Sequence, residues 1–230
     1  MNNKIWILLV ALSLFSIAVY SQDKQVREVG SFHGIRSSQG IDVYLKKGPK
    51  ESVRVEVSGI DQSDLITEVA GSNLRIHMRE GVRRWGNHSA KVYVTYVALD
   101  RIHASSASNI FSEDVIKAST LEINCSSGAN AEIRLECDRV VTDASSAGKI
   151  RLEGKATTLE LEASSAGDID AYNLESEIVH ASASSAGSAK VNSSKEIEAQ
   201  ASSGGSIRYR GNPTRTNTSS SSGGSVKKSN

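Results

Sequence analysis

Apolar and polar residues alternate on both sides of a short recurring phrase, a pair of serines followed by two small residues. Counted from the first serine, apolar or small side chains occupy positions five, three and one before it, and five and seven after it. Such alternation buries every second side chain of a strand, whereas a helix would need apolar residues three and four positions apart. Each repeat is therefore predicted to be a strand, a tight corner and a second strand.

The spacing of the serine pairs predicts how these units are arranged. The pairs recur every 18 to 21 residues, at Ser105-Ser106, Ser126-Ser127, Ser145-Ser146, Ser164-Ser165, Ser184-Ser185, Ser202-Ser203 and Ser221-Ser222. A fixed period of this kind is typical of a solenoid, in which each repeat stacks on the next. The predicted fold class is all-β: a single-stranded parallel β-helix, or solenoid, with coils of about 19 residues.

The corners are expected to be small because backbones of neighbouring coils lie about 4.8 Å apart. Continued through the corner, the alternation places the second serine of each pair inside. An unpaired buried hydroxyl costs about 1–3 kcal/mol, so these serines are predicted to form a hydrogen-bonded ladder. A role as nucleophiles is disfavoured, because no histidine or lysine recurs at a matching spacing to act as base.

One outward column, six residues after each first serine, carries charges of changing sign. It reads Phe111, Glu132, Arg151, Asp170, Lys190, Arg208 and Lys227. In-register stacking would place opposite charges one strand apart, where each exposed pair contributes about 0.2–1 kcal/mol. A slip of one residue would exchange the inner and outer sets, so these charges are predicted to fix the register.

Residues 22–100 are predicted to form an N-terminal β-strand cap, continuous as one domain with the repeats of residues 101–230. Residues 41–45 and 53–57 alternate on either side of a Gly-Pro turn, which predicts a hairpin. The phrase Ser37-Ser38-Gln39-Gly40 resembles the repeat, but the apolar residues after it have the opposite parity. It is therefore not expected to be a coil in register. A cap would cover strand edges that the open end of a solenoid exposes.

The N-terminus has the organisation of a secretory signal. Lys4 gives a positive start, residues 5–19 are apolar, and Val19-Tyr20-Ser21 offers small residues to a signal peptidase. Residues 1–21 are therefore predicted to be a signal peptide, cleaved before Gln22. An uncleaved anchor is the less favoured alternative, because the apolar run is shorter than the about 20 residues that a span needs. No cysteine stands at the junction to carry a lipid.

Charge and composition narrow the partners further. Residues 1–21 contain one basic residue and no acidic one, so their removal lowers the net charge from +1 to zero. Such a chain attracts neither nucleic acid nor an anionic membrane by its field, and no stable membrane span is predicted in the mature chain. The five histidines show no metal-ligand spacing, and no cofactor is predicted. Cys125 and Cys137 could form a disulfide across the core, but two buried thiols are favoured because bridge geometry is exacting.

The candidate partner contact is Arg83, Arg84 and Trp85, in a loop between two predicted strands. Arginine and tryptophan are enriched in interface hot spots, loops carry much of protein function, and the repeat does not require these residues. The alternative is a solvated loop whose tryptophan packs back onto the sheet.

Several motifs together resemble the putative auto-transporter adhesin head GIN domain family. They are Phe32, Ile41-Asp42-Val43-Tyr44-Leu45, Val92-Tyr93-Val94, the Ser-Ser-Ala-Gly corners, and residues 207–213 with residues 224–227. The chain departs from the family's usual Val-Pro at Tyr96-Val97. The resemblance extends over residues 30–228 and implies an exported bacterial β-solenoid, without catalytic residues.

Two classes of function follow from these patterns. The favoured one is an exported, non-catalytic, adhesin-like binding or scaffolding module in the periplasm, on the outer surface or outside the cell, with a glycan or cell-envelope protein as partner. The alternative is a polysaccharide-cleaving β-helix enzyme, since paired carboxylates can act as acid and base. Its candidate carboxylates are Asp143, Glu160, Glu162, Asp168 and Asp170. Because basic residues alternate with them, a mixed charged surface is favoured, and the protein is predicted not to be an enzyme.

Overall fold

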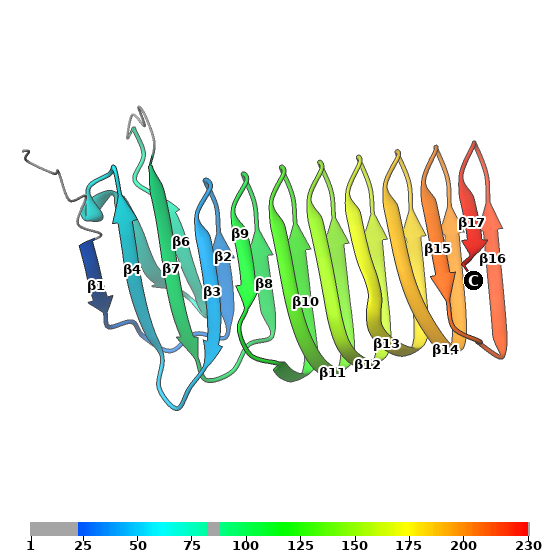
Figure 1. The fold of residues 1–230 in the computed structure, drawn as a ribbon, viewed down its shortest axis with the longest axis horizontal. Helices are drawn as coiled ribbons and strands as arrows, with labels where there is room; N and C mark the ends of the chain where they lie inside the picture. The colour runs from blue at the N-terminus through cyan, green and yellow to red at the C-terminus, as the bar shows by residue number, and fades with distance from the viewer. Residues whose placement is uncertain (1–22, 82–87, 230) are drawn as a thin grey trace, which may run out of the picture.

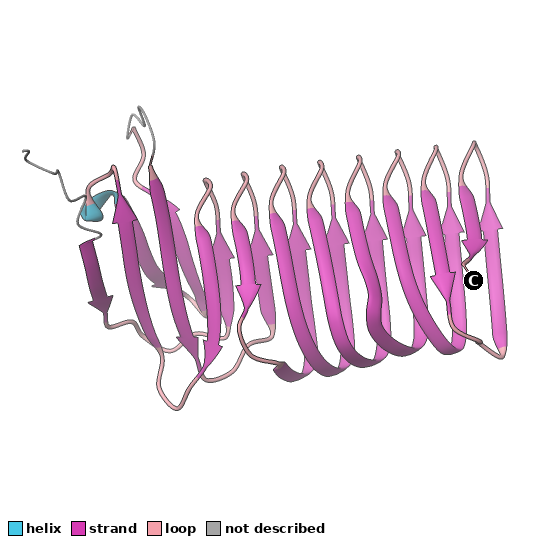
Figure 2. Ribbon diagram, in the orientation of Figure 1, coloured by secondary structure: helices cyan, strands magenta, loops and turns pink. Residues whose placement is uncertain are grey.

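The computed structural model describes residues 23–81 and 88–229, which stack into a β-solenoid (Figure 1). Strands make up nearly all of its ordered structure, and the described helical structure is a single 3-10 turn, η1 (Gln62–Asp64) (Figure 2). The predicted fold class, a parallel β-solenoid with a strand cap, is confirmed.

Each coil gives one strand to each of two walls. In the repeat coils, the chain approaches the corner along one wall, which we call the leading wall, and leaves it along the other, the trailing wall. In order along the stack, the leading wall consists of β5 (Leu65–Ala70), β6 (Asn73–Met78), β2 (Gly34–Ser37), β8 (Arg101–Ala104), β10 (Ile116–Cys125), the second halves of β11 (Asn130–Ala144), β12 (Lys149–Ala163), β13 (Asp168–Ala183) and β14 (Ser188–Ala201), and β16 (Arg215–Ser220). The trailing wall leaves the corners and consists of β1 (Asp23–Arg27), β4 (Ser52–Ser58), β7 (Ser89–Tyr96), β3 (Asp42–Lys47), β9 (Asn109–Ser112), the first halves of β11 to β14, β15 (Ser206–Arg210) and β17 (Ser225–Lys228). Strands β11 to β14 curve from one wall into the other at the edge opposite the corners (Figure 1).

The core is the narrow space between these walls. The inner positions five residues before the first serine are fully buried, and they hold Leu121, Val140, Leu159, Val179 and Ile197. The outward positions between them are at least partly exposed, as the alternation predicts. The hydrophobic pattern therefore determines which side of each strand faces the core.

The corners differ from the prediction, because the second serine is not inside. Ser146 is exposed with φ 48°, Ala147 follows with φ 61°, and the Gly148 amide donates to the Ser145 carbonyl at 2.8 Å. Two successive left-handed residues closed by this bond form a type I′-like turn, which carries the second serine out of the wall. The inner corner position is the fourth residue, and the predicted serine ladder is wrong. Backbone bonds join the corners instead, such as Ala147 N–H to the Ser165 carbonyl at 3.1 Å.

The segment around Ser37-Ser38-Gln39-Gly40 is a coil in register, contrary to the prediction. Ser37 pairs with Ala104 and Val43 with Ile110, both in parallel. Ser38, and not Ser37, therefore matches the first serine of the repeat phrase, Ser105. This offset accounts for the opposite parity.

The predicted hairpin between residues 41–45 and 53–57 is also wrong. β7 lies between the two strands, parallel to β3 and antiparallel to β4. The antiparallel strands β1, β4 and β5 stand at the first end of the two walls and cap the stack, whereas β2, β3, β6 and β7 pair in parallel within it.

The charged column of the trailing wall pairs as predicted. Glu132 lies opposite Arg151, Arg151 opposite Asp170, and Asp170 opposite Lys190. Two of these contacts are ion pairs, Arg151 to Glu132 at 3.4 Å and Lys190 to Asp170 at 3.2 Å.

Arg151→Glu should therefore place three carboxylates on consecutive strands. We expect the free energy of unfolding to fall by about 0.2–1 kcal/mol at low salt, because the pairs are exposed and like charges repel across strands. Urea unfolding at low and at high ionic strength checks this, since salt screens exposed charges. An equal loss at both would contradict this register of charges.

Candidate functional site

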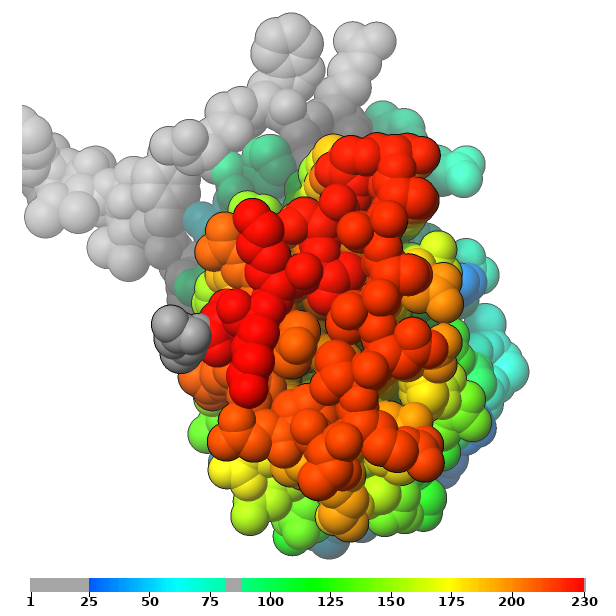
Figure 3. Space-filling model, turned by 90° about the vertical axis from the view of Figure 1, so that its right-hand side faces the viewer, coloured from blue at the N-terminus to red at the C-terminus, as the bar shows by residue number. Residues whose placement is uncertain are grey.

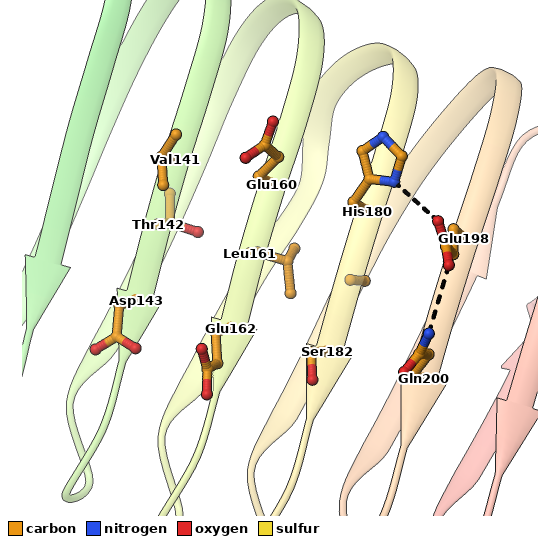
Figure 4. Close-up of a pocket in the computed structure, with 11 residues that line it drawn as sticks. Val141, Thr142, Asp143, Glu160, Leu161, Glu162, His180, Ser182, Glu198 and Gln200 are labelled. Atoms are coloured by element: carbon orange, nitrogen blue, oxygen red, sulfur yellow. Dashed lines mark hydrogen bonds and ion pairs between the residues drawn. The ribbon is translucent and has the colours of Figure 1, made fainter.

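A groove of about 500 Å³ crosses the leading wall over β11 to β14 (Figure 4). Its polar lining comes from outward positions two and four residues before the first serine, which in-register stacking brings into two columns. We name it the acidic groove; its charged side chains are Asp143, Glu160, Glu162, His180 and Glu198. Val141 adds an apolar contact, and Ser182 and Gln200 complete one side.

The carboxylates of the acidic groove differ in their partners. Glu160 accepts a hydrogen bond from Arg139 at 2.7 Å, and Glu198 Oε2 lies 3.3 Å from His180 Nδ1. Asp143 and Glu162 lie opposite each other on neighbouring strands, and within the described residues neither forms a hydrogen bond or ion pair. Burial, and then the charge of Glu162, raise the pKa of Asp143. The groove is therefore rich in acceptors and suited to hydroxyl or ammonium donors.

The five carboxylates of the enzyme hypothesis are divided between the two walls. Asp143, Glu160 and Glu162 line the acidic groove, whereas Asp168 and Asp170 lie on the trailing-wall half of β13. Asp168 accepts a hydrogen bond from Ser188, and Asp170 pairs with Lys190. Of the five carboxylates, only Asp143, Glu160 and Glu162 lie in one groove.

The next groups to consider are possible metal ligands and the two cysteine thiols among the described residues. Residues 23–81 and 88–229 hold no group of three or more histidine, cysteine, aspartate or glutamate side chains that could bind a metal ion. Cys125 and Cys137 are both buried and unbridged, which confirms the favoured prediction. Burial, with a smaller effect of Asp143, raises the pKa of the Cys125 thiol to about 12, so it is not available as a nucleophilic thiolate at neutral pH.

The predicted contact residues Arg83, Arg84 and Trp85 lie outside the described residues. Of the strands before and after them, β6 ends at Met78 and β7 begins at Ser89.

Sequence reasoning missed two clusters near this end of the stack. The first is a stack of aromatic rings on the trailing wall: Tyr44 lies 5.1 Å from Tyr93 and 5.3 Å from Phe111 between centroids, and Arg54 covers the outer face of Tyr93. Because the rings cover one another's faces, this cluster stabilises the register instead of offering a platform for sugars. The second is a basic groove on the leading wall, lined by Arg36, Arg75, His77 and His103. Taking Ser38 as the first serine would have aligned Arg36 with His103.

No helix among the described residues is long and apolar enough to cross a membrane. Stacked parallel coils, a strand cap and polar grooves on an outer wall define the protein as a β-solenoid of the binding-module type. The chain belongs to the family described as putative auto-transporter adhesin, head GIN domain, whose model matches residues 31–213. The resemblance seen in the sequence is thereby confirmed.

Solved structures share the fold at low sequence identity. A putative adhesin from Bacteroides fragilis is 20% identical with a TM-score of 0.82, over 91% of this chain and 97% of that chain. A putative adhesin from Parabacteroides merdae is 16% identical with a TM-score of 0.76, over 91% and 96% of the two chains. A protein from Parabacteroides distasonis named as a putative lipid binding protein is 16% identical with a TM-score of 0.69, over 91% and 97%. No curated protein matches the chain.

Proposed function

We propose that this protein is an exported, non-catalytic binding or scaffolding module of the bacterial envelope or cell surface. The observation that carries the proposal is the family match over residues 31–213, in a solenoid related in fold to proteins named as putative adhesins. The signal-like residues 1–21 support export. Stacking alone accounts for the repeated serines and alternating residues, which leaves the outer walls and the loops for recognition.

The loop residues Arg83, Arg84 and Trp85 remain our proposal for one contact with that partner. A variant with Arg84→Ala and Trp85→Ala should lose binding without a change in melting temperature, because truncating hot-spot residues removes interface contacts and the repeat pattern does not require these residues. The measurement is binding of the mature chain to a glycan array and to purified envelope proteins. Arg208→Ala with Lys227→Ala, on the trailing wall, is the control. Unchanged binding in the loop variant would contradict this contact.

The enzyme alternative is tested by an activity assay on the same mature chain. Cleavage of a polysaccharide, with or without calcium, that disappears in Asp143→Asn with Glu162→Gln would overturn the non-catalytic proposal. We expect no turnover, because Glu160 is hydrogen-bonded to Arg139 and Glu198 lies against His180, as in a mixed charged surface.

A further inference from the structure

The basic groove lies on the leading wall near the cap, across β6, β2 and β8, and has a volume of about 450 Å³. The register places Arg36 opposite Arg75 on one side and opposite His103 on the other. Three basic side chains thus occupy three consecutive strands in one column. Like charges directly opposite each other destabilise a sheet, so the placement of Arg36 opposite Arg75 is an electrostatic cost to the fold.

One carboxylate, Glu68, lies opposite Arg75 in this column and offsets the cost at that end only. Glu68 is 3.8 Å from both Arg75 and His77, and each of these side chains is well exposed or only partly buried. Glu122 contacts Arg101 at 3.5 Å, in the adjacent column. Glu80 is the acidic residue among those that line the groove.

Two basic side chains in the column have no such partner. Within the described residues, Arg36 and His103 form no hydrogen bond or ion pair. Burial, and then the charge of Arg36, lower the pKa of His103. His77 Nδ1 lies 3.0 Å from the Met78 carbonyl oxygen, whereas its buried Nε2 makes no hydrogen bond and lies 3.8 Å from Glu68 Oε1.

The trailing wall carries a second charged column for comparison. There Glu132, Arg151, Asp170 and Lys190 alternate in sign on consecutive strands, and Arg208 and Lys227 continue the column with like charges in the last coils. The alternating part of that column stabilises the register, whereas Arg36 opposite Arg75 opposes it. The basic column differs from the run of Lys190, Arg208 and Lys227 because it lines a groove, in which one anionic ligand can contact several basic side chains.

We propose that the basic groove binds an anionic saccharide through its sulfate or phosphate groups. The proposal rests on the proposed binding function and names a ligand class for it. Arginine guanidinium groups match the oxygens of such anions in bidentate fashion. Basic side chains on successive strands, about 4.8 Å apart, can contact charged groups on neighbouring sugar units. The groove volume is within the range of about 300–1,000 Å³ that is usual for sites of small ligands.

The test compares dextran sulfate with uncharged dextran as ligands of the mature chain, residues 22–230, by isothermal titration calorimetry. We expect dextran sulfate to bind, uncharged dextran not to bind, and the affinity to fall with added salt. Arg36→Glu with Arg75→Glu should weaken binding by at least about tenfold. Arg36→Gln with Arg75→Gln should also weaken it while relieving repulsion, so its melting temperature should not fall.

The matched control is Arg208→Glu with Lys227→Glu, which makes the same change of charge on two paired strands of the trailing wall. This variant should keep the wild-type affinity. An equal loss of affinity in both charge-reversal variants, or no binding of dextran sulfate, would contradict binding in the basic groove. Binding to phosphatidylglycerol vesicles in preference to dextran sulfate would contradict the proposal that the ligand is a saccharide. If a glycan array shows only uncharged ligands, this inference fails while the proposed binding function stands.

Discussion

Replacing Gly167 with alanine should lower the free energy of unfolding by more than about 3 kcal/mol, one of the largest effects open to a single methyl group. Gly167 is the buried fourth residue of a corner, and a Cβ there would lie 2.0 Å from the carbonyl oxygen of Ala144 in the coil before it. That oxygen accepts the amide of Ser164, so it cannot move aside without separating two coils. Urea unfolding followed by circular dichroism measures the loss.

The same exchange at Gly128 is the matched control. Gly128 is exposed in a corner with φ 70°, and a methyl group added there would meet no atom within 4 Å other than those of its chain neighbours. Alanine there should cost only the strain of a left-handed residue, about 1 kcal/mol. Ala129, buried one residue later, shows that an earlier coil accommodates a methyl group at the inner position. Equal losses at Gly167 and Gly128 would refute the close approach of coils.

Thr216→Ile with Thr218→Ile should make the protein self-associate more strongly than the unsubstituted chain does. In β14 the inner positions hold Ile197 and Ala199, which are buried, and β16 places Thr216 and Thr218 opposite them. All of β16 is exposed, because it lies in the last described coil at the end of the stack (Figure 3). Two isoleucines would make an apolar patch beside an unpaired strand edge, which is a template for pairing with another chain.

Sedimentation velocity at several protein concentrations measures this association. Asn217→Ile with Ser219→Ile is the control, since these positions alternate with the threonines and lie on the outer side of the same strand. We expect the control to sediment as the unsubstituted chain does over the range in which the first variant associates. Association of both to the same degree would show that added hydrophobicity, and not the inner side of the last coil, is responsible.

The stacking register beside the corners could be predicted from the sequence. Arg151 lies between Glu132 and Asp170 as expected, because all three stand six residues after the first serine of their coils. Farther from the corners the register shifts, between Arg151 and Glu153 for example, where coils of unequal length pair. The corner could not be predicted in the same way. Alternation of inner and outer side chains holds for extended strands. Ser146 and Ala147 have positive φ, so the alternation does not continue through the turn. The prediction therefore placed the second serine on the wrong side of the wall.

The sequence by itself determined the solenoid, its period and the inner face of the strands that flank the serine pairs of residues 101–230, since these follow from local alternation and a regular spacing. Only the tertiary structure decided the order of the first coils, in which β2 lies between β6 and β8 although the chain forms it first. That order brings Arg36, Arg75 and His103 into one column. Arg36 and His103 each precede a serine phrase by two residues, but no serine phrase marks Arg75. Hydrogen bonding between distant segments, β6 with β2, is therefore what adds Arg75 to the groove.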